Sequence, residues 1–141
     1  AGLPGLLRHR RALGVTAFTY ALVHFLTYAW LDQGWVIDDI VADVIKRNFI
    51  LVGFVALLLM LPLALTSFNR AIKALGAARW QALHKAVYAV AVLAVLHFFW
   101  MRAGKNDFGE WAVYAVVLAA LLGWRLRRQL QRRRSTARLT S

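Results

Sequence analysis

The fold class is decided by residues 49–60, which read FILVGFVALLLM. An amphipathic helix of a soluble protein would interrupt such a run with a polar stripe at 3.6-residue spacing. This run carries no polar side chain, so every face of the predicted helix is apolar. A very apolar soluble bundle is therefore the less favoured alternative, and the run predicts a helix that crosses a membrane.

Three other stretches of the chain share this character. A helix needs roughly 20 apolar residues to cross a hydrocarbon core of about 30 Å. We therefore predict an all-α integral membrane bundle that forms one domain over residues 1–141, with a basic segment at 1–11 and a basic tail at 127–141. The four predicted transmembrane helices cover about residues 12–31, 49–68, 82–101 and 108–126.

The composition limits the kinds of protein that this chain can be. It has 141 residues, of which 61% are hydrophobic and 17% charged, and 18 Lys and Arg stand against 6 Asp and Glu, for a net charge of +12. A soluble nucleic-acid-binding domain rarely combines such a charge with so apolar a composition. The absence of cysteine excludes thiolate zinc sites, iron–sulfur clusters, catalytic cysteines and covalent c-type haem.

The charges are divided unequally between the loops. The two ends and the middle loop hold 14 basic residues and no acidic one, whereas the other two loops hold 4 basic and 6 acidic residues. Basic loops stay in the cytoplasm, so we expect both termini there. The Arg-rich tail then fixes topology and attracts anionic lipid, and we expect no nucleic-acid partner. In the first acidic loop, apolar residues at 40, 41, 44 and 45 predict a short amphipathic helix on the outer membrane surface.

Three histidines lie within the predicted transmembrane helices: His24, His84 and His97. An ionisable residue in a membrane segment is a functional candidate by default, and imidazole is the usual axial ligand of non-covalent haem. The alternative is a histidine that forms a hydrogen bond between helices. Three such residues together favour haem ligation.

Counting residues along the helices predicts which histidines pair. From the cytoplasmic ends of their helices, His24 lies about 18 Å deep and His97 about 22 Å, because an α-helix rises 1.5 Å per residue. The two are therefore expected to be the axial ligands of one haem on the outer side. His84 lies only about 3 Å deep by the same count and is expected to serve a second haem or cofactor site.

At these residues the chain resembles the haem-binding membrane subunits of bacterial periplasmic methionine sulfoxide reductase systems, within the ferric-reductase-like transmembrane family. His24 and His84 are 60 residues apart and His97 follows 13 residues later, as in that family. The similar stretches are residues 10–14 (RRALG), 22–28 (LVHFLTY), 61–67 (LPLALTS), 79–85 (RWQALHK) and 97–100 (HFFW).

The resemblance implies a b-type haem ligated by His24 and His97, with His84 also associated with haem, so one or two haems are expected. It implies electrons from a cytoplasmic flavin reductase or from quinol, with bound FMN as a further candidate. The electrons would pass to a periplasmic molybdopterin-containing methionine sulfoxide reductase, which performs the substrate chemistry, so no catalytic residue is expected in this chain. The implied location is the bacterial inner membrane.

Two features depart from the family pattern. The chain starts at Ala1 without an initiator Met, whereas family members have further transmembrane sequence before this point. A second family histidine would fall at Arg10 or Arg11, which are instead candidates for haem propionates or a flavin phosphate, or are topology determinants. The rival function is a structural or assembly membrane subunit whose histidines bridge helices without haem.

Overall fold

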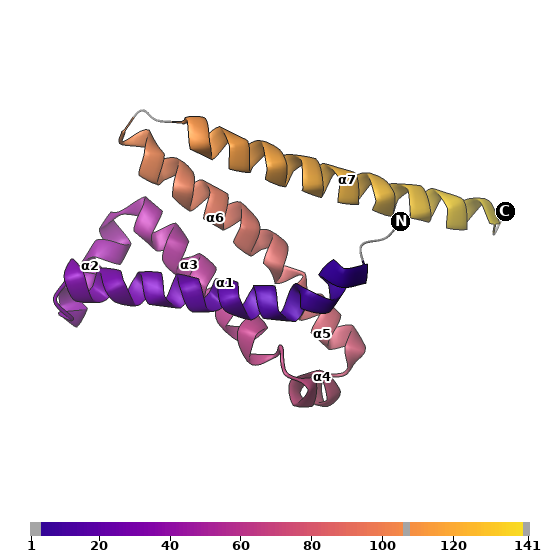
Figure 1. The fold of residues 1–141 in the computed structure, drawn as a ribbon, viewed down its shortest axis with the longest axis horizontal. Coiled ribbons are helices and arrows are strands. Elements are labelled where there is room, and N and C mark those ends of the chain that lie inside the picture. The colour runs from indigo at the N-terminus through magenta and orange to yellow at the C-terminus, as the bar shows by residue number, and fades with distance from the viewer. Residues whose placement is uncertain (1–3, 106–107, 140–141) are drawn as a thin grey trace. The chain divides into compact units, whose positions relative to one another are not determined.

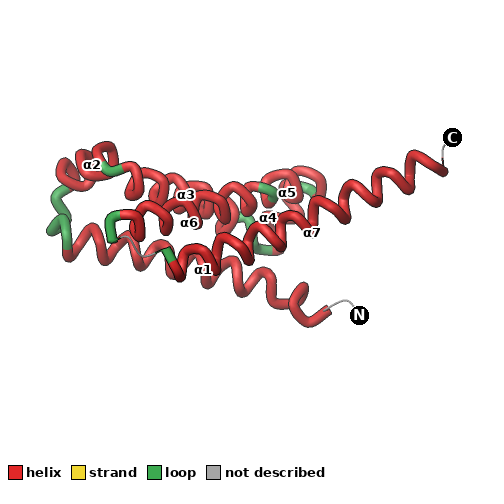
Figure 2. Tube along the Cα trace, turned by 90° about the horizontal axis from the view of Figure 1, so that it is seen from above, coloured by secondary structure: helices red, strands yellow, loops and turns green. Residues whose placement is uncertain are grey.

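The computed structural model describes residues 4–105 and 108–139, and within these ranges the chain contains helices and short loops but no strand (Figures 1 and 2). Apolar runs without charges favour helices, since a chain in lipid must satisfy its backbone polar groups internally. The helices in chain order are α1 (Pro4–Leu31), α2 (Ile37–Lys46), α3 (Asn48–Leu65), α4 (Asn69–Leu75), α5 (Ala77–His84), α6 (Ala86–Ala103) and α7 (Gly109–Leu139).

Four stretches of helix in the described part are long and apolar enough to cross a membrane, which confirms the predicted all-α membrane architecture. The third stretch consists of two helices, because α5 ends at His84 and α6 begins at Ala86. Around Lys85 the hydrogen bonds tighten to three-residue spacing, from Lys85 N–H to the Ala82 carbonyl and from Tyr88 N–H to the Lys85 carbonyl. The four stretches are His9–Leu31, Asn48–Leu65, Ala77–Ala103 and Gly109–Gln131.

Helix ends differ from the predicted bounds where residues outside the apolar runs favour helix. Helix α1 starts at Pro4 rather than near residue 12, because proline suits the first turn and the following arginines and leucines are good helix formers. Helix α7 continues to Leu139 for the same reason, so most of the predicted basic tail is helical. Residues 1–3 and 140–141 of the predicted basic ends lie outside the described residues.

Helix α3 ends at Leu65 instead of near residue 68. The hydroxyl of Thr66 donates to the Pro62 carbonyl at 2.6 Å, and the hydroxyl of Ser67 donates to the Leu63 carbonyl at 2.7 Å. The Pro62 carbonyl also accepts from the Thr66 backbone N–H at 3.0 Å, so the two hydroxyls supplement the backbone bonds at the end of the helix. The apolar run thus ends in two hydroxyl caps.

The chain divides into two compact units, residues 1–97 and 98–141. In the first unit, α3 packs against both α1 and α2. Small side chains let transmembrane helices approach closely, and large apolar side chains are left to face lipid. The buried residues, among those whose burial is described, are Ala29, Val44, Ala56 and Val90.

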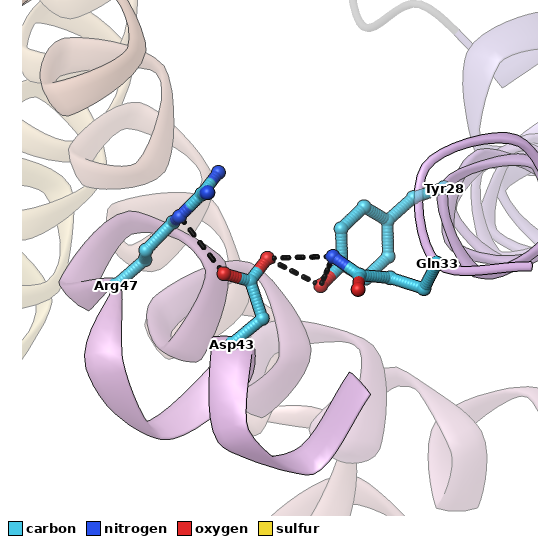
Figure 3. A network of polar contacts seen from close by, with 4 residues as sticks. All are labelled: Tyr28, Gln33, Asp43 and Arg47. Atoms are coloured by element: carbon cyan, nitrogen blue, oxygen red, sulfur yellow. Dashed lines mark hydrogen bonds and ion pairs between the residues drawn. The ribbon is translucent and has the colours of Figure 1, made fainter. Parts of the chain in front are cut away.

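The amphipathic helix predicted in the first acidic loop is present as α2, and a polar network holds it to the end of α1 (Figure 3). Asp43 is the centre of this network. One carboxylate oxygen accepts from the Tyr28 hydroxyl at 2.7 Å and from the Gln33 amide at 3.0 Å, and the other pairs with Arg47 at 2.8 Å. The carboxylate therefore links α1, α2 and the start of α3.

The second unit joins the end of α6 to α7 through aromatic side chains. The Phe99 ring lies 5.0 Å from Trp111 and 5.7 Å from Phe108, between ring centroids. Arg102 forms an ion pair with Glu110 across the same turn. These contacts hold the helical hairpin of this unit together.

Candidate functional site

Helices α1 and α6 bring His24 and His97 together, with ring centroids 6.4 Å apart and ring planes at 74°. A metal–imidazole nitrogen bond is about 2 Å long, so two imidazoles on opposite sides of one metal ion have centroids about 6 Å apart. The observed separation therefore fits one iron between the two rings. His24 is exposed and His97 is half-buried.

The orientation of the His97 ring is fixed by a backbone group of another helix. Its Nδ1 lies 2.6 Å from the carbonyl oxygen of Phe49, in the first turn of α3. A carbonyl can only accept a hydrogen bond, so Nδ1 must carry the proton and donate. In the neutral form of the ring this bond selects the tautomer whose Nε2 has a lone pair available to a metal.

One phenylalanine ring lies beside His97, and two others pack against each other from positions next to His24 and Gly53 in the sequence. Phe49 lies 6.3 Å from His97, and Phe25 lies 5.3 Å from Phe54, between ring centroids. Phe25 directly follows His24 in α1, and Phe54 directly follows Gly53 in α3. Such rings add apolar surface near the two histidines.

Two histidines are enough protein ligands for an iron whose other ligands come from a porphyrin. In residues 4–105 and 108–139, no group of three or more His, Cys, Asp or Glu side chains is placed to hold a metal ion. A porphyrin supplies four equatorial nitrogens, so haem iron needs only two axial ligands from the protein. The pair His24 and His97 matches that requirement.

His84 lies in a different environment, at the end of α5. Its ring stacks on Trp80 with centroids 4.0 Å apart and planes at 28°. Its Nε2 lies 3.1 Å from the Thr66 hydroxyl, and the Trp80 indole N–H donates to the Thr66 carbonyl at 2.9 Å. Thr66 thus links both aromatic side chains to the end of α3.

The two arginine candidates near the start of α1 differ in their surroundings. A guanidinium nitrogen of Arg11 donates to the Asn69 side-chain oxygen at 3.1 Å, and the group lies 5.4 Å from the centre of the Phe68 ring. Arg11 therefore attaches α1 to the start of α4. Arg10 lies within electrostatic range of His84.

Sequence reasoning missed the groups that hold the histidine rings. The Phe49 carbonyl is a backbone atom and leaves no signal in a sequence. Gly53 is packed against the His97 ring, and its signal was a single glycine in a run of large apolar residues. Trp80 and Thr66 were visible as part of the resemblance, but their contacts with His84 depend on how α3 ends.

The chain is similar to several curated proteins named "Protein-methionine-sulfoxide reductase heme-binding subunit MsrQ". The relative from Polaromonas naphthalenivorans is 59% identical over 123 residues, covering 87% of this chain and 56% of the relative. The relative from Azospira oryzae is 56% identical over 126 residues, covering 89% and 54%. The relative from Bordetella pertussis is 50% identical over 132 residues, covering 94% and 64%.

The chain spans a little over half the length of the first of these relatives. No solved structure matches it at a significant level. The model of the family described as "Ferric reductase like transmembrane component" matches residues 2–95, which include His24 and His84 and end two residues before His97. The match covers more than half of the chain, which therefore belongs to the family of ferric-reductase-like transmembrane components.

Proposed function

We propose that this chain is the electron-transfer part of a membrane subunit and binds a b-type haem with His24 and His97 as axial ligands. The observation that carries the proposal is the 6.4 Å separation of the two rings. The His97 ring also has its Nδ1 bonded to Phe49, which leaves Nε2 for iron. Bound haem supplies one-electron chemistry, which none of the common side chains here provides.

The protein residues around this site have two tasks. With His24 and His97 both as ligands, a bound haem would have no position left for a substrate and would be suited to electron transfer. The Phe49 ring beside His97 offers apolar surface to a bound macrocycle. Substrate reduction is therefore assigned to a partner protein.

The proposed electron path runs outward across the bacterial inner membrane. The donor is a cytoplasmic flavin reductase or quinol, and the acceptor is a periplasmic molybdopterin-containing methionine sulfoxide reductase. The names of the relatives support a methionine sulfoxide reductase system. The distribution of basic residues supports termini in the cytoplasm, with residues 1–141 acting as one haem domain.

On the cytoplasmic side we propose a second haem or cofactor site at His84. Its Nε2 is bonded to Thr66, so a ligand would be reached through Nδ1. Arg10, within electrostatic range of His84, is the better candidate for a haem propionate or an FMN phosphate. Arg11 already has Asn69 as a partner.

One observation favours the rival function, a structural subunit without haem. His97 and His84 each form a hydrogen bond to another helix or its end, as bridging histidines would. The His24 ring forms no such bond among the described residues, and its nearest aromatic neighbour is His97 itself. Helix bridging therefore explains two of the three histidines, whereas haem ligation also explains His24.

The optical spectrum of the purified full-length protein tests the proposal. Protein from haem-replete cells is expected to show a low-spin haem spectrum, and His24→Ala or His97→Ala is expected to remove it while the helices still form. Folded wild-type protein without haem absorbance would establish the rival function. Full haem content in both variants would refute the ligand pair.

A further inference from the structure

The backbone of α3 at Gly53 lies directly beside the His97 ring. A Cβ atom added to Gly53 would lie 2.8 Å from Nδ1 and 2.9 Å from Cε1 of His97. Non-bonded heavy atoms pack at about 3.5 Å or more, so no larger residue fits here unless the ring moves. The ring thus rests directly on the backbone of α3.

The contact with Gly53 and the hydrogen bond to Phe49 depend on each other. In an α-helix the carbonyl of residue 49 points along the axis toward the amide of residue 53, one turn later. A side chain from another helix reaches that carbonyl only by passing beside residue 53. The missing side chain at Gly53 leaves that path open, and the His97 Nδ1 follows it to within 2.6 Å of the Phe49 oxygen.

From this geometry we infer that Gly53 is a positioning residue for His97: its bare backbone lets the ring donate from Nδ1 to the Phe49 carbonyl, so that Nε2 faces the haem iron. The haem in this inference rests on the proposed function. The position of the His97 ring does not depend on it. A hydrogen bond at the outer nitrogen of a ligating histidine fixes its tautomer and increases its basicity.

Gly53→Ala tests the inference in the full-length protein. The added methyl group displaces the ring and weakens its bond to Phe49, so we expect haem affinity to fall about tenfold or more. In the haem that remains, the less basic ligand stabilises ferric iron less. The midpoint potential should therefore rise, and the low-spin ferric EPR signal should shift.

Gly123→Ala is the matched control, because Gly123 also lies inside a predicted membrane helix and a Cβ there meets nothing within 4 Å. Both substitutions favour the helix equally. Gly123→Ala should keep wild-type haem content, potential and EPR signal. Equal haem loss in both variants would overturn the inference.

The failure of the inference is distinguishable from the failure of the proposed function. If His97→Ala loses haem while Gly53→Ala keeps wild-type affinity and potential, only the positioning role is wrong. If His97→Ala keeps its haem unchanged, the ligand pair is wrong.

A measurement without haem then decides the positioning role by itself. Nitrogen-15 NMR of histidine-labelled, haem-free protein in micelles should show His97 protonated at Nδ1 in the wild type and in Gly123→Ala. In Gly53→Ala this single tautomer should be lost. A mixture of tautomers in the wild type, or no change in Gly53→Ala, would overturn the inference even if the protein never binds haem.

Discussion

The two histidine clusters of the first unit use the same side chain in opposite ways. At His97 a backbone carbonyl accepts the hydrogen bond from Nδ1 and leaves Nε2 to a ligand, in a ring that lies beside a second histidine. At His84 the Nε2 atom is itself bonded, to the Thr66 hydroxyl, and the ring is covered by Trp80. The first ring can therefore offer Nε2 to a ligand, whereas the second can offer only Nδ1.

The two clusters should differ most in the effect of removing their histidines. His97→Ala removes an axial ligand, so haem bound between α1 and α6 should fall at least tenfold, because second-shell losses alone cost that much. His84→Ala should leave the bis-histidine spectrum of that haem unchanged. Haem per protein, measured as the pyridine haemochrome, checks both variants.

The same measurement of haem per protein shows whether His84 binds a second haem. A halving of haem in His84→Ala, with the bis-histidine spectrum intact, would assign a second haem to this residue. An unchanged haem content would leave His84 with a flavin or with its structural role. Loss of the bis-histidine spectrum in His84→Ala would contradict the separation of the two clusters.

Trp80→Leu has the next largest expected effect, on stability. It removes the stacked ring beside His84 and the indole hydrogen bond to the Thr66 carbonyl. Stacking contributes about 1 kcal/mol and the hydrogen bond about as much, so the free energy of unfolding should fall by about 2 kcal/mol. Unfolding in mixed micelles measures this difference.

Trp30→Leu is the matched control, because Trp30 is 62% exposed and stands near the end of α1 in the same unit. Its free energy of unfolding should change by less than about 0.5 kcal/mol. Similar losses in both variants would mean that the cluster around His84 adds no specific stability.

Much of the fold was predictable because it depends on a one-dimensional property, the length of uncharged apolar runs. The pairing of His24 with His97 also followed from counting residues along two helices, and the structure brings these rings together. The break at Lys85 and the early end of α3 were not predictable from hydropathy, since they depend on individual hydrogen bonds.

The groups around the histidines were also not predictable from the sequence, since they too depend on individual contacts. The partner of His97 is the Phe49 carbonyl, which every residue type possesses, and access to it depends on a glycine one turn away. Only the three-dimensional contact between α3 and α6 distinguishes Gly53 from any other small residue. A sequence can thus indicate a ligating side chain without indicating the groups that orient it.

The smallest expected effect tests the hydrogen bond that ties His84 to the fold. Thr66→Val keeps the shape of the side chain but removes the hydroxyl that contacts His84 Nε2 and caps the Pro62 carbonyl. Hydrogen bonds between membrane helices average about 0.6 kcal/mol, so a loss of that size in the free energy of unfolding is expected. Thr19→Val is the control, because within the described residues its hydroxyl bonds only to the Val15 carbonyl of its own helix. A larger loss in Thr66→Val than in Thr19→Val isolates the contact with His84, and equal losses would show that Thr66 acts as a helix cap alone.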